Sequence, residues 1–480
     1  RAIEVEQADG TVTRYAYDKV DNRIAMTRAA GLSEAQTTTY TYDRNNRLLV
    51  QTDALGHSTR FEYDANGNVS AQYDELNHRT RYEYDANNRV RFIFDALDHA
   101  TEYRYDGNGN RTVVIDALGR ATTTGYNRNN EITLTINAEG EATSFGYDDN
   151  GNVIERRSHA ARFAGPVDPG APPAIALGAE DQITRYRYDG VNRLTHTLDA
   201  EGFVTESRYD GVGNVVATVA YAERALTGAD AFVPAASAKD QLTVLQYDRV
   251  NRLVERTDAE GYVTRWKYDA VGNRIEQRLY LDRTDRANPL LQQVTVTDYD
   301  RMSRVVLERS ALGLETHYAY DKRGNRTTQI EAFGTAAQRS TLYTYDAADR
   351  LRTVTEAAGT ADAVVTYRDL DNAGRLVGQT RAYGTAQARS ETWEYDDADR
   401  RTLHSRADGT VEKTEYDALG NVQRRIDALG TSDQRSTHFA YDRTNRLVAA
   451  TVGEGRPEAL ITRYAYDAFG NRTREAVAEG

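Results

Sequence analysis

Hydrophobic and polar residues alternate over short stretches along the chain, and each stretch ends in a cluster of turn-forming residues. Residues 59–63, Thr-Arg-Phe-Glu-Tyr, alternate between polar and apolar side chains, which is typical of a half-buried β-strand. Residues 64–68, Asp-Ala-Asn-Gly-Asn, favour a hairpin turn because Asn-Gly accepts a positive φ readily. Residues 69–73 alternate again, and residues 74–77 predict a second turn. The pattern therefore predicts a unit of two short strands and two turns.

This unit recurs along the chain, and a Tyr-Asp pair marks the end of its first strand. Nineteen copies align, with nine spacings of 21 residues, six of 25, and three longer ones of 31, 38 and 41. Self-similarity of this length indicates a repeat architecture. We expect the Tyr, the Asp and, where present, the turn Gly to be structural signature residues. They include Tyr42, Asp43, Tyr63, Asp64, Gly67, Tyr84, Asp85, Tyr105, Asp106, Gly109, Tyr268, Asp269, Gly272, Tyr320, Asp321, Gly324, Tyr416, Asp417, Gly420, Tyr466, Asp467 and Gly470.

Stacking these units predicts one long antiparallel β-sheet of about 38 strands, and hence an all-β fold. Because strand twist prevents such a ribbon from staying flat, we expect it to coil into a spiral or barrel-like hollow shell. Residues 1–480 are interpreted as one continuous array of about 19 units, a piece of a longer polypeptide. The long spacings place irregular insertions near residues 156–182, 222–240 and 283–292, and a short helix is one option within 222–240.

The two faces of the ribbon are predicted to differ. A second aromatic residue stands two positions before the signature Tyr in thirteen of the nineteen copies, as in Phe61 and Trp266. Period-2 parity places these rings on the face of the signature Tyr, so we expect aromatic ladders along the ribbon. Arg60 and Glu62 fall on the opposite face, which predicts a lattice of mixed charges there.

Composition changes this picture in three ways. Leu, Ile, Val and Phe make up only roughly a fifth of the chain, so the 32 tyrosines must supply much of the buried apolar surface. The formal net charge of −13 disfavours binding to nucleic acid or to an anionic membrane surface, and no apolar run is long enough to span a membrane. The absence of cysteine excludes disulfides and thiolate metal sites.

Candidate chemistry is sparse, and we predict no catalytic residue, no cofactor and no metal. Asp64 to Asn68 resemble a calcium loop only faintly, because the further oxygen ligands and distal Glu are missing. His57, His78 and His99 recur every 21 residues, but Arg120 follows and no fixed carboxylate accompanies them, so they are interpreted as surface-turn histidines. No nucleophile elbow, phosphate loop or zinc-protease motif occurs, and glycan contact at exposed rings is the remaining binding alternative.

The motif Tyr-Asp-x-x-Gly-Asn/Arg, followed by a strand and Asp-Ala-Leu-Gly, resembles the RHS/YD-repeat family over nearly the whole chain. That family includes bacterial rearrangement-hotspot proteins, the shell component of insecticidal toxin complexes and the teneurin barrel. The resemblance implies a secreted or cell-surface bacterial shell that encloses a toxin polypeptide, with the rest of its own chain and delivery machinery as partners. The alternative is an extended surface adhesin or filament that contacts glycans.

Overall fold

The computed structural model describes residues 1–480 except 166–172, 174, 226–231, 233, 457 and 480. It contains one antiparallel sheet of 39 strands, in which each strand pairs with the next strand along the chain. The first third of the sheet comprises β1 (Glu4–Glu6), β2 (Val12–Tyr17), β3 (Arg23–Arg28), β4 (Gln36–Tyr42), β5 (Leu48–Thr52), β6 (Ser58–Tyr63), β7 (Val69–Tyr73), β8 (Arg79–Tyr84), β9 (Val90–Phe94), β10 (Ala100–Tyr105), β11 (Arg111–Ile115), β12 (Ala121–Tyr126) and β13 (Ile132–Ile136).

The sheet continues without a change in topology to the end of the chain. The middle strands are β14 (Ala142–Tyr147), β15 (Val153–Ser158), β16 (Gln182–Tyr188), β17 (Leu194–Leu198), β18 (Val204–Tyr209), β19 (Val215–Ala220), β20 (Gln241–Tyr247), β21 (Leu253–Thr257), β22 (Val263–Tyr268), β23 (Arg274–Tyr280), β24 (Gln292–Tyr299), β25 (Val305–Arg309) and β26 (Glu315–Tyr320). The last strands are β27 (Arg326–Glu331), β28 (Arg339–Tyr345), β29 (Leu351–Glu356), β30 (Val364–Leu370), β31 (Leu376–Arg381), β32 (Arg389–Tyr395), β33 (Arg401–Ser405), β34 (Val411–Tyr416), β35 (Val422–Asp427), β36 (Arg435–Tyr441), β37 (Leu447–Val452), β38 (Leu460–Tyr466) and β39 (Arg472–Glu479).

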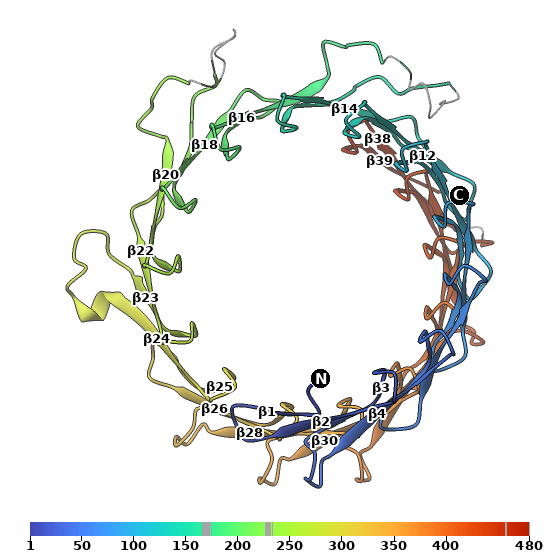
Figure 1. Cartoon of the computed structure of the whole chain (residues 1–480), viewed down its shortest axis with the longest axis vertical. Coiled ribbons are helices and arrows are strands. Elements are labelled where there is room, and N and C mark those ends of the chain that lie inside the picture. Colours follow the sequence, from blue (N-terminus) through green and yellow to red (C-terminus); the bar gives the residue numbers. More distant parts are fainter. Residues whose placement is uncertain (166–172, 174, 226–231, 233, 457, 480) are drawn as a thin grey trace.

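The sheet bends into a ring that continues past one full turn, so the N-terminal strands overlap the C-terminal strands (Figure 1). No strand pairing joins the two overlapping coils among the described residues, so the sheet is an open spiral and not a closed barrel. The strands surround an open centre (Figure 1). This architecture confirms the all-β, coiled antiparallel sheet predicted from the repeat.

Three long connections interrupt the regular turns, and their described parts project outward from the ring (Figure 1). They lie between β15 and β16, β19 and β20, and β23 and β24. The 3₁₀-helix η1 (Pro289–Leu291) lies in the third connection. The described part of residues 222–240 contains no helix, and residues 226–231 and 233 of that segment lie outside the described residues. No helix of the described chain is long and apolar enough to cross a membrane.

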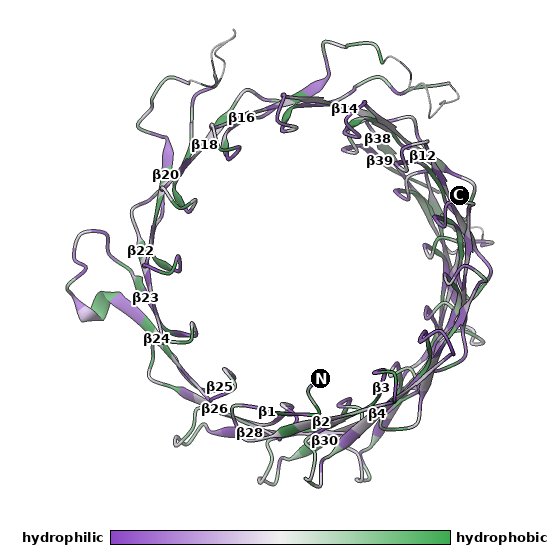
Figure 2. Cartoon of the chain, viewed as in Figure 1, coloured by the Kyte–Doolittle hydropathy of each residue, from purple (hydrophilic) through white to green (hydrophobic). Residues whose placement is uncertain are grey.

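The wall is one sheet thick, and its hydrophobic and hydrophilic residues are mixed along the whole ring (Figure 2). Continuous aromatic ladders, predicted from parity, are not formed among the residues that the structure describes. The cross-strand partner of Phe61 is Gln72, which lies on the return strand of the same unit. Because each unit contributes two strands, equivalent rings of neighbouring units are about 9.6 Å apart. That separation exceeds the roughly 4.5–7 Å range of ring contacts. Trp266 likewise pairs with Gln277, and its Nε1 donates to the Gln277 side chain at 3.2 Å.

The predicted segregation of aromatic and charged faces is also wrong in part. Arg60 is exposed, as parity predicts, but its cross-strand partner is Tyr73, and its guanidinium lies 4.5 Å from the centre of the Tyr73 ring. Arg81 stacks in the same way on Phe94, at 3.5 Å. The return strands therefore bring aromatic rings to the charged face, where arginines cover them and reduce their exposed apolar area.

Candidate functional site: the tyrosine-aspartate turn and the seam between coils

The signature aspartate organises each turn that follows a Tyr-Asp pair, which we call a YD turn. In residues 64–68, Asp64 Oδ1 accepts hydrogen bonds from the amides of Asn66 and Asn68, both at 2.9 Å. The second oxygen, Oδ2, accepts from the Asn68 side chain at 2.9 Å. The carboxylate thus satisfies two turn amides that the hairpin ladder leaves without a partner, in an Asx-type arrangement.

The fourth position of each YD turn requires a positive φ. Gly67 has φ of +93°, and the same position is occupied by Asn88, at +59°, and by Asp399, at +62°. Glycine adopts this conformation without strain, and Asn and Asp tolerate it better than other side chains. The predicted role of Asn-Gly is therefore carried by its second residue, because Asn66 itself does not have a positive φ.

The signature tyrosine ties its turn to the preceding unit. Tyr63 Oη donates to the carbonyl oxygen of Leu48 at 2.8 Å, so the phenol meets a backbone acceptor at the start of the previous return strand. Arg47, the last residue of the preceding YD turn, covers the Tyr63 ring at 4.6 Å and donates from Nε to Asp43 at 2.7 Å. One arginine thereby joins the aspartate of one unit to the tyrosine of the next.

The predicted signature residues all take these positions. The aspartates Asp43, Asp64, Asp85, Asp106, Asp269, Asp321, Asp417 and Asp467 accept the two turn amides at 2.8–3.0 Å. The tyrosines Tyr42, Tyr63, Tyr84, Tyr105, Tyr268, Tyr320, Tyr416 and Tyr466 donate to a carbonyl of the preceding unit at 2.8–2.9 Å. The glycines Gly67, Gly109, Gly272, Gly324, Gly420 and Gly470 have φ between +82° and +106°.

Hydrogen bonding lowers the pKa of YD-turn aspartates such as Asp64 and Asp442. The Asn68 side chain and the turn amides hold the pKa of Asp64 below its ordinary value, despite partial desolvation. Burial raises the pKa of Asp442, but hydrogen bonds from Arg446 and Thr444 outweigh it, and the pKa lies below its ordinary value. Burial raises the pKa of Tyr63. The network is therefore built for charged aspartates and neutral tyrosines.

A second set of polar contacts joins the two overlapping coils, and we call it the seam. On the N-terminal coil the seam uses linking turns, which connect one unit to the next, and on the C-terminal coil it uses YD turns. Arg120, at the end of one linking turn, donates to the Asp442 carbonyl at 2.9 Å and to Asn445 Oδ1 at 2.7 Å. These residues are 322 and 325 positions apart. Opposite edges of one ribbon therefore meet along the seam.

Charged residues continue this pattern on both sides of Arg120. Asp349 pairs with Arg28 at 2.6 Å and accepts from Gln36 at 3.0 Å. Glu139 accepts from the backbone amide of Arg443 at 2.7 Å. The seam could not be predicted from the sequence, because contacts such as Glu139 with Arg443 and Arg120 with Asn445 span 304 and 325 residues and their register depends on the curvature of the ribbon.

The three periodic histidines each occupy the last position of a linking turn. Their predicted lack of an accompanying carboxylate is wrong, because an aspartate stands four residues before each one. The Nδ1 atom of His57 lies 3.3 Å from the Asp53 carboxylate. The Nδ1 atoms of His78 and His99 each lie 3.0 Å from the carboxylates of Asp74 and Asp95, respectively. Only His78 among these three also meets carboxylates of the C-terminal coil in the described structure.

Ser144, His159 and Asp181 form a linked group that no sequence motif predicted. Ser144 Oγ lies 2.9 Å from His159 Nε2, and His159 Nδ1 lies 3.3 Å from Asp181. His159 is only 2% exposed and the Asp181 side chain is 1% exposed, so both are buried, whereas Ser144 is half-buried. Asp181 also accepts from the amides of Ala160 and Gly178, and the group therefore closes the base of the first long connection.

Comparison with known families agrees with this geometry. A Teneurin YD-shell model matches residues 53–217, and an RHS Repeat model matches residues 1–33, 247–279 and 416–457. Together the two models cover more than half of the chain. The chain belongs to the RHS/YD-repeat family. No curated protein sequence matches this RHS/YD-repeat chain.

Solved structures share the fold of this RHS/YD-repeat chain. TcdB2-TccC3 without its hypervariable C-terminal region gives a TM-score of 0.65 at 13% identity, covering 98% of this chain and 28% of that chain. TcdB2-TccC3 gives 0.60 at 14% identity, covering 98% and 30%. The Photorhabdus luminescens Tc holotoxin pore gives 0.58 at 13% identity, covering 100% and 29%. The chain thus spans less than a third of the length of these structures.

Proposed function

We propose that this chain is a non-enzymatic wall segment of an RHS/YD-repeat shell, arranged as one continuous array of units, and that the shell encloses a toxin polypeptide for delivery. The observation that carries the proposal is the spiral itself. The ribbon curves through more than a full turn around an open centre, and the seam fastens one coil to the next (Figure 1). A stack of such coils makes a wall around a volume.

The distribution of polar groups supports a structural role. The aspartates, tyrosines and arginines of the YD turns are engaged with one another in unit after unit, as the contacts of Arg47, Tyr63, Arg89 and Tyr105 show. In the described part of the chain, the histidine and the aspartate of the Ser144-His159-Asp181 group are buried, with 2% of the His159 side chain and 1% of the Asp181 side chain exposed.

The proposed partners are the remainder of the parent polypeptide, an enclosed toxin segment and a delivery machinery, and the proposed location is the bacterial surface or exterior. Support comes from the fold shared with TcdB2-TccC3 and with the Tc holotoxin pore. The net charge of −13 disfavours nucleic acid as a partner, and aspartates of the YD turns engage arginines such as Arg47 and Arg89.

Single-particle electron microscopy of the full-length parent polypeptide tests the proposal. We expect a closed hollow body with additional density inside it, and an enclosed segment that resists protease until the shell is opened by denaturant. Removing the enclosed segment genetically should leave the outline of the shell and delete only the inner density. An open rod or filament with no inner density would contradict encapsulation and favour the adhesin alternative.

A further inference from the structure

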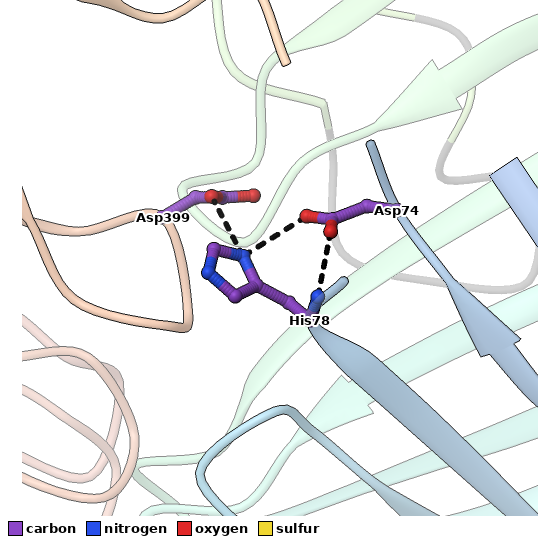
Figure 3. Close-up of side chains that lie close together, drawn as sticks. All are labelled: Asp74, His78 and Asp399. Atoms are coloured by element: carbon purple, nitrogen blue, oxygen red, sulfur yellow. Dashed lines mark hydrogen bonds and ion pairs between the residues drawn. The ribbon is translucent and has the colours of Figure 1, made fainter. Parts of the chain in front are cut away.

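His78 lies where the seam brings carboxylates of both coils around one imidazole. Asp74 and His78 belong to the linking turn between β7 and β8, and Asp399 belongs to the YD turn between β32 and β33 (Figure 3). Nδ1 of His78 lies 3.0 Å from Asp74 Oδ2 and 3.8 Å from Asp399 Oδ1, and Nε2 lies 3.6 Å from Asp397 Oδ1. Among the described residues this is the one such cluster whose donor atoms all lie within 4.8 Å.

From this geometry we propose that Asp74, His78 and Asp399 form a binding site for a divalent transition-metal ion, of the Zn²⁺ type, that staples the two coils. Two ligands bound at about 2.1 Å with a tetrahedral angle are about 3.4 Å apart. The observed nitrogen–oxygen separations of 3.0 and 3.8 Å bracket that value. An imidazole combined with carboxylates selects a first-row transition metal over Ca²⁺ or Mg²⁺, which take oxygen ligands.

The first ligand is held in position by its own turn. Asp74 Oδ1 accepts from the amides of Leu76 at 2.9 Å and His78 at 2.7 Å, which leaves Oδ2 directed at the imidazole. This outer hydrogen bonding is the support that metal-binding carboxylates use to fix their orientation. The Asp74 side chain is 26% exposed and that of His78 is 18% exposed, so the imidazole side of the site is substantially desolvated.

Carboxylates outnumber cationic side chains around the site. Asp74, Asp95, Asp397 and Asp399 line a cavity of about 430 Å³ beside His78, together with one arginine, Arg400. Arg400 is engaged by Asp396 at 2.8 Å and by the Asp417 carbonyl at 2.8 Å. Arg375 donates to Asp399 Oδ1 at 2.5 Å, so an ion would share this oxygen or take Oδ2. Carboxylates from two coils gathered in one place repel one another, and a bound divalent ion relieves that repulsion.

The chain contains its own controls for this proposal. His57 and His99 occupy the same turn position and contact their own aspartates, Asp53 and Asp95, with nearly the same geometry. In the described structure neither meets a carboxylate of the other coil within ion-pair distance. A simple hydrogen-bonded histidine-aspartate pair predicts equal behaviour of all three histidines, whereas a stapling ion requires His78 alone.

Isothermal titration of the metal-free 480-residue chain with ZnCl₂ at neutral pH tests the site. We expect a saturable step of one Zn²⁺ per chain that excess Ca²⁺ does not displace. His78→Gln and Asp399→Asn should each weaken that step at least about tenfold, whereas His99→Gln and His57→Gln should leave it unchanged. Asparagine tolerates the positive φ of position 399, so Asp399→Asn retains the turn.

Thermal unfolding supplies a second readout that does not depend on the titration heat. Zn²⁺ should raise the unfolding midpoint of the parent chain and of His99→Gln, and should have no effect on His78→Gln. The proposal is overturned if Zn²⁺ shows no saturable binding, if Ca²⁺ displaces it, or if His99→Gln loses as much affinity as His78→Gln. Equal midpoints of the metal-free variants would show that each has folded.

Discussion

Arg446 Nη1 lies 2.9 Å from Glu141 Oε1, although the two residues belong to different coils of the ribbon. The same guanidinium donates from Nε to Asp442, so it joins the YD turn of its own unit to a linking turn of the other coil. Arg162 donates to the same Glu141 oxygen at 2.9 Å. Arg446 therefore holds the aspartate of its own YD turn, as the equivalent arginines of other units do, and also contacts the neighbouring coil.

The positive φ at position 67 makes this glycine sensitive to substitution. Gly67→Val should lower the free energy of unfolding by about 1–3 kcal/mol, because a β-branched residue is strained at φ of +93°. Gly67→Asn should cost much less, since Asn88 holds the same position at +59°. Denaturant unfolding of both variants measures the difference. Superimposable curves for Gly67→Val and the parent chain would contradict the turn geometry.

Acid should destabilise the wall through its turn aspartates. The pKa values of YD-turn aspartates such as Asp64 and Asp442 lie below their ordinary value in the folded chain, so unfolding takes up protons at low pH. Their contribution is complete above about pH 4, the unfolded value, and is lost as the pH falls through the folded pKa. We expect the thermal midpoint to be flat between about pH 5 and 7 and to fall steeply below about pH 4. A midpoint that rises on acidification would contradict this sign.

The seam should depend on salt in a way that single-coil turns do not. Glu139→Ala removes the acceptor of the Arg443 amide and should lower the free energy of unfolding by about 1 kcal/mol. Because the contact involves an ionised side chain near solvent, the loss should shrink in about 1 M salt. Glu201 holds the same position in an equivalent turn outside the seam and is exposed, so Glu201→Ala should have no measurable effect. Equal losses in both variants would show that Glu139 acts within its own turn.

Asp240 should close the second long connection. Its carboxylate accepts from the amides of Ala222 and Ser237, both at 2.9 Å, as Asp181 accepts from two amides in the first connection. Asp240→Ala should speed hydrogen exchange of the Ala222 and Ser237 amides by about fivefold or more, corresponding to a bond of about 1 kcal/mol. Asp240→Asn retains one acceptor and should protect one of the two amides. Unchanged exchange at both amides in Asp240→Ala would show that Asp240 does not hold the two ends of the connection together.

The contacts that follow from local sequence were predictable, and those that follow from curvature were not. Asp64 to Asn68 form a turn whose partners all lie within five residues, and the alternation of residues 59–63 fixes a strand by its period. The contact of Tyr63 with Leu48 reaches back 15 residues and requires the strand register. The contact of Arg28 with Asp349 spans 321 residues and requires the number of units in one coil, which no local pattern states.

The candidate metal site shows the same limit. His78 and Asp74 are separated by four residues and lie in contact within one turn, so their pairing is visible in the sequence once the turn is known. Asp399 comes from the other coil, and nothing near His78 in the sequence distinguishes it from His57 or His99. Aromatic parity failed for a different reason, because the two-strand repeat places Gln72 where a neighbouring ring was expected.

The seam also makes the copy number of the repeat a determinant of the wall's dimensions. Arg446 now faces Glu141, and Arg120 faces Asn445. Deleting one unit from the single-layered part of the ring would shift the later YD turns back by one place, and Arg446 would then face Arg120. Adding one unit would shift the phase in the other direction. The charge pattern along the two edges thus favours one number of units per coil, and hence one circumference. Related walls should gain or lose units within one coil only together with compensating charge changes on the other side of the seam.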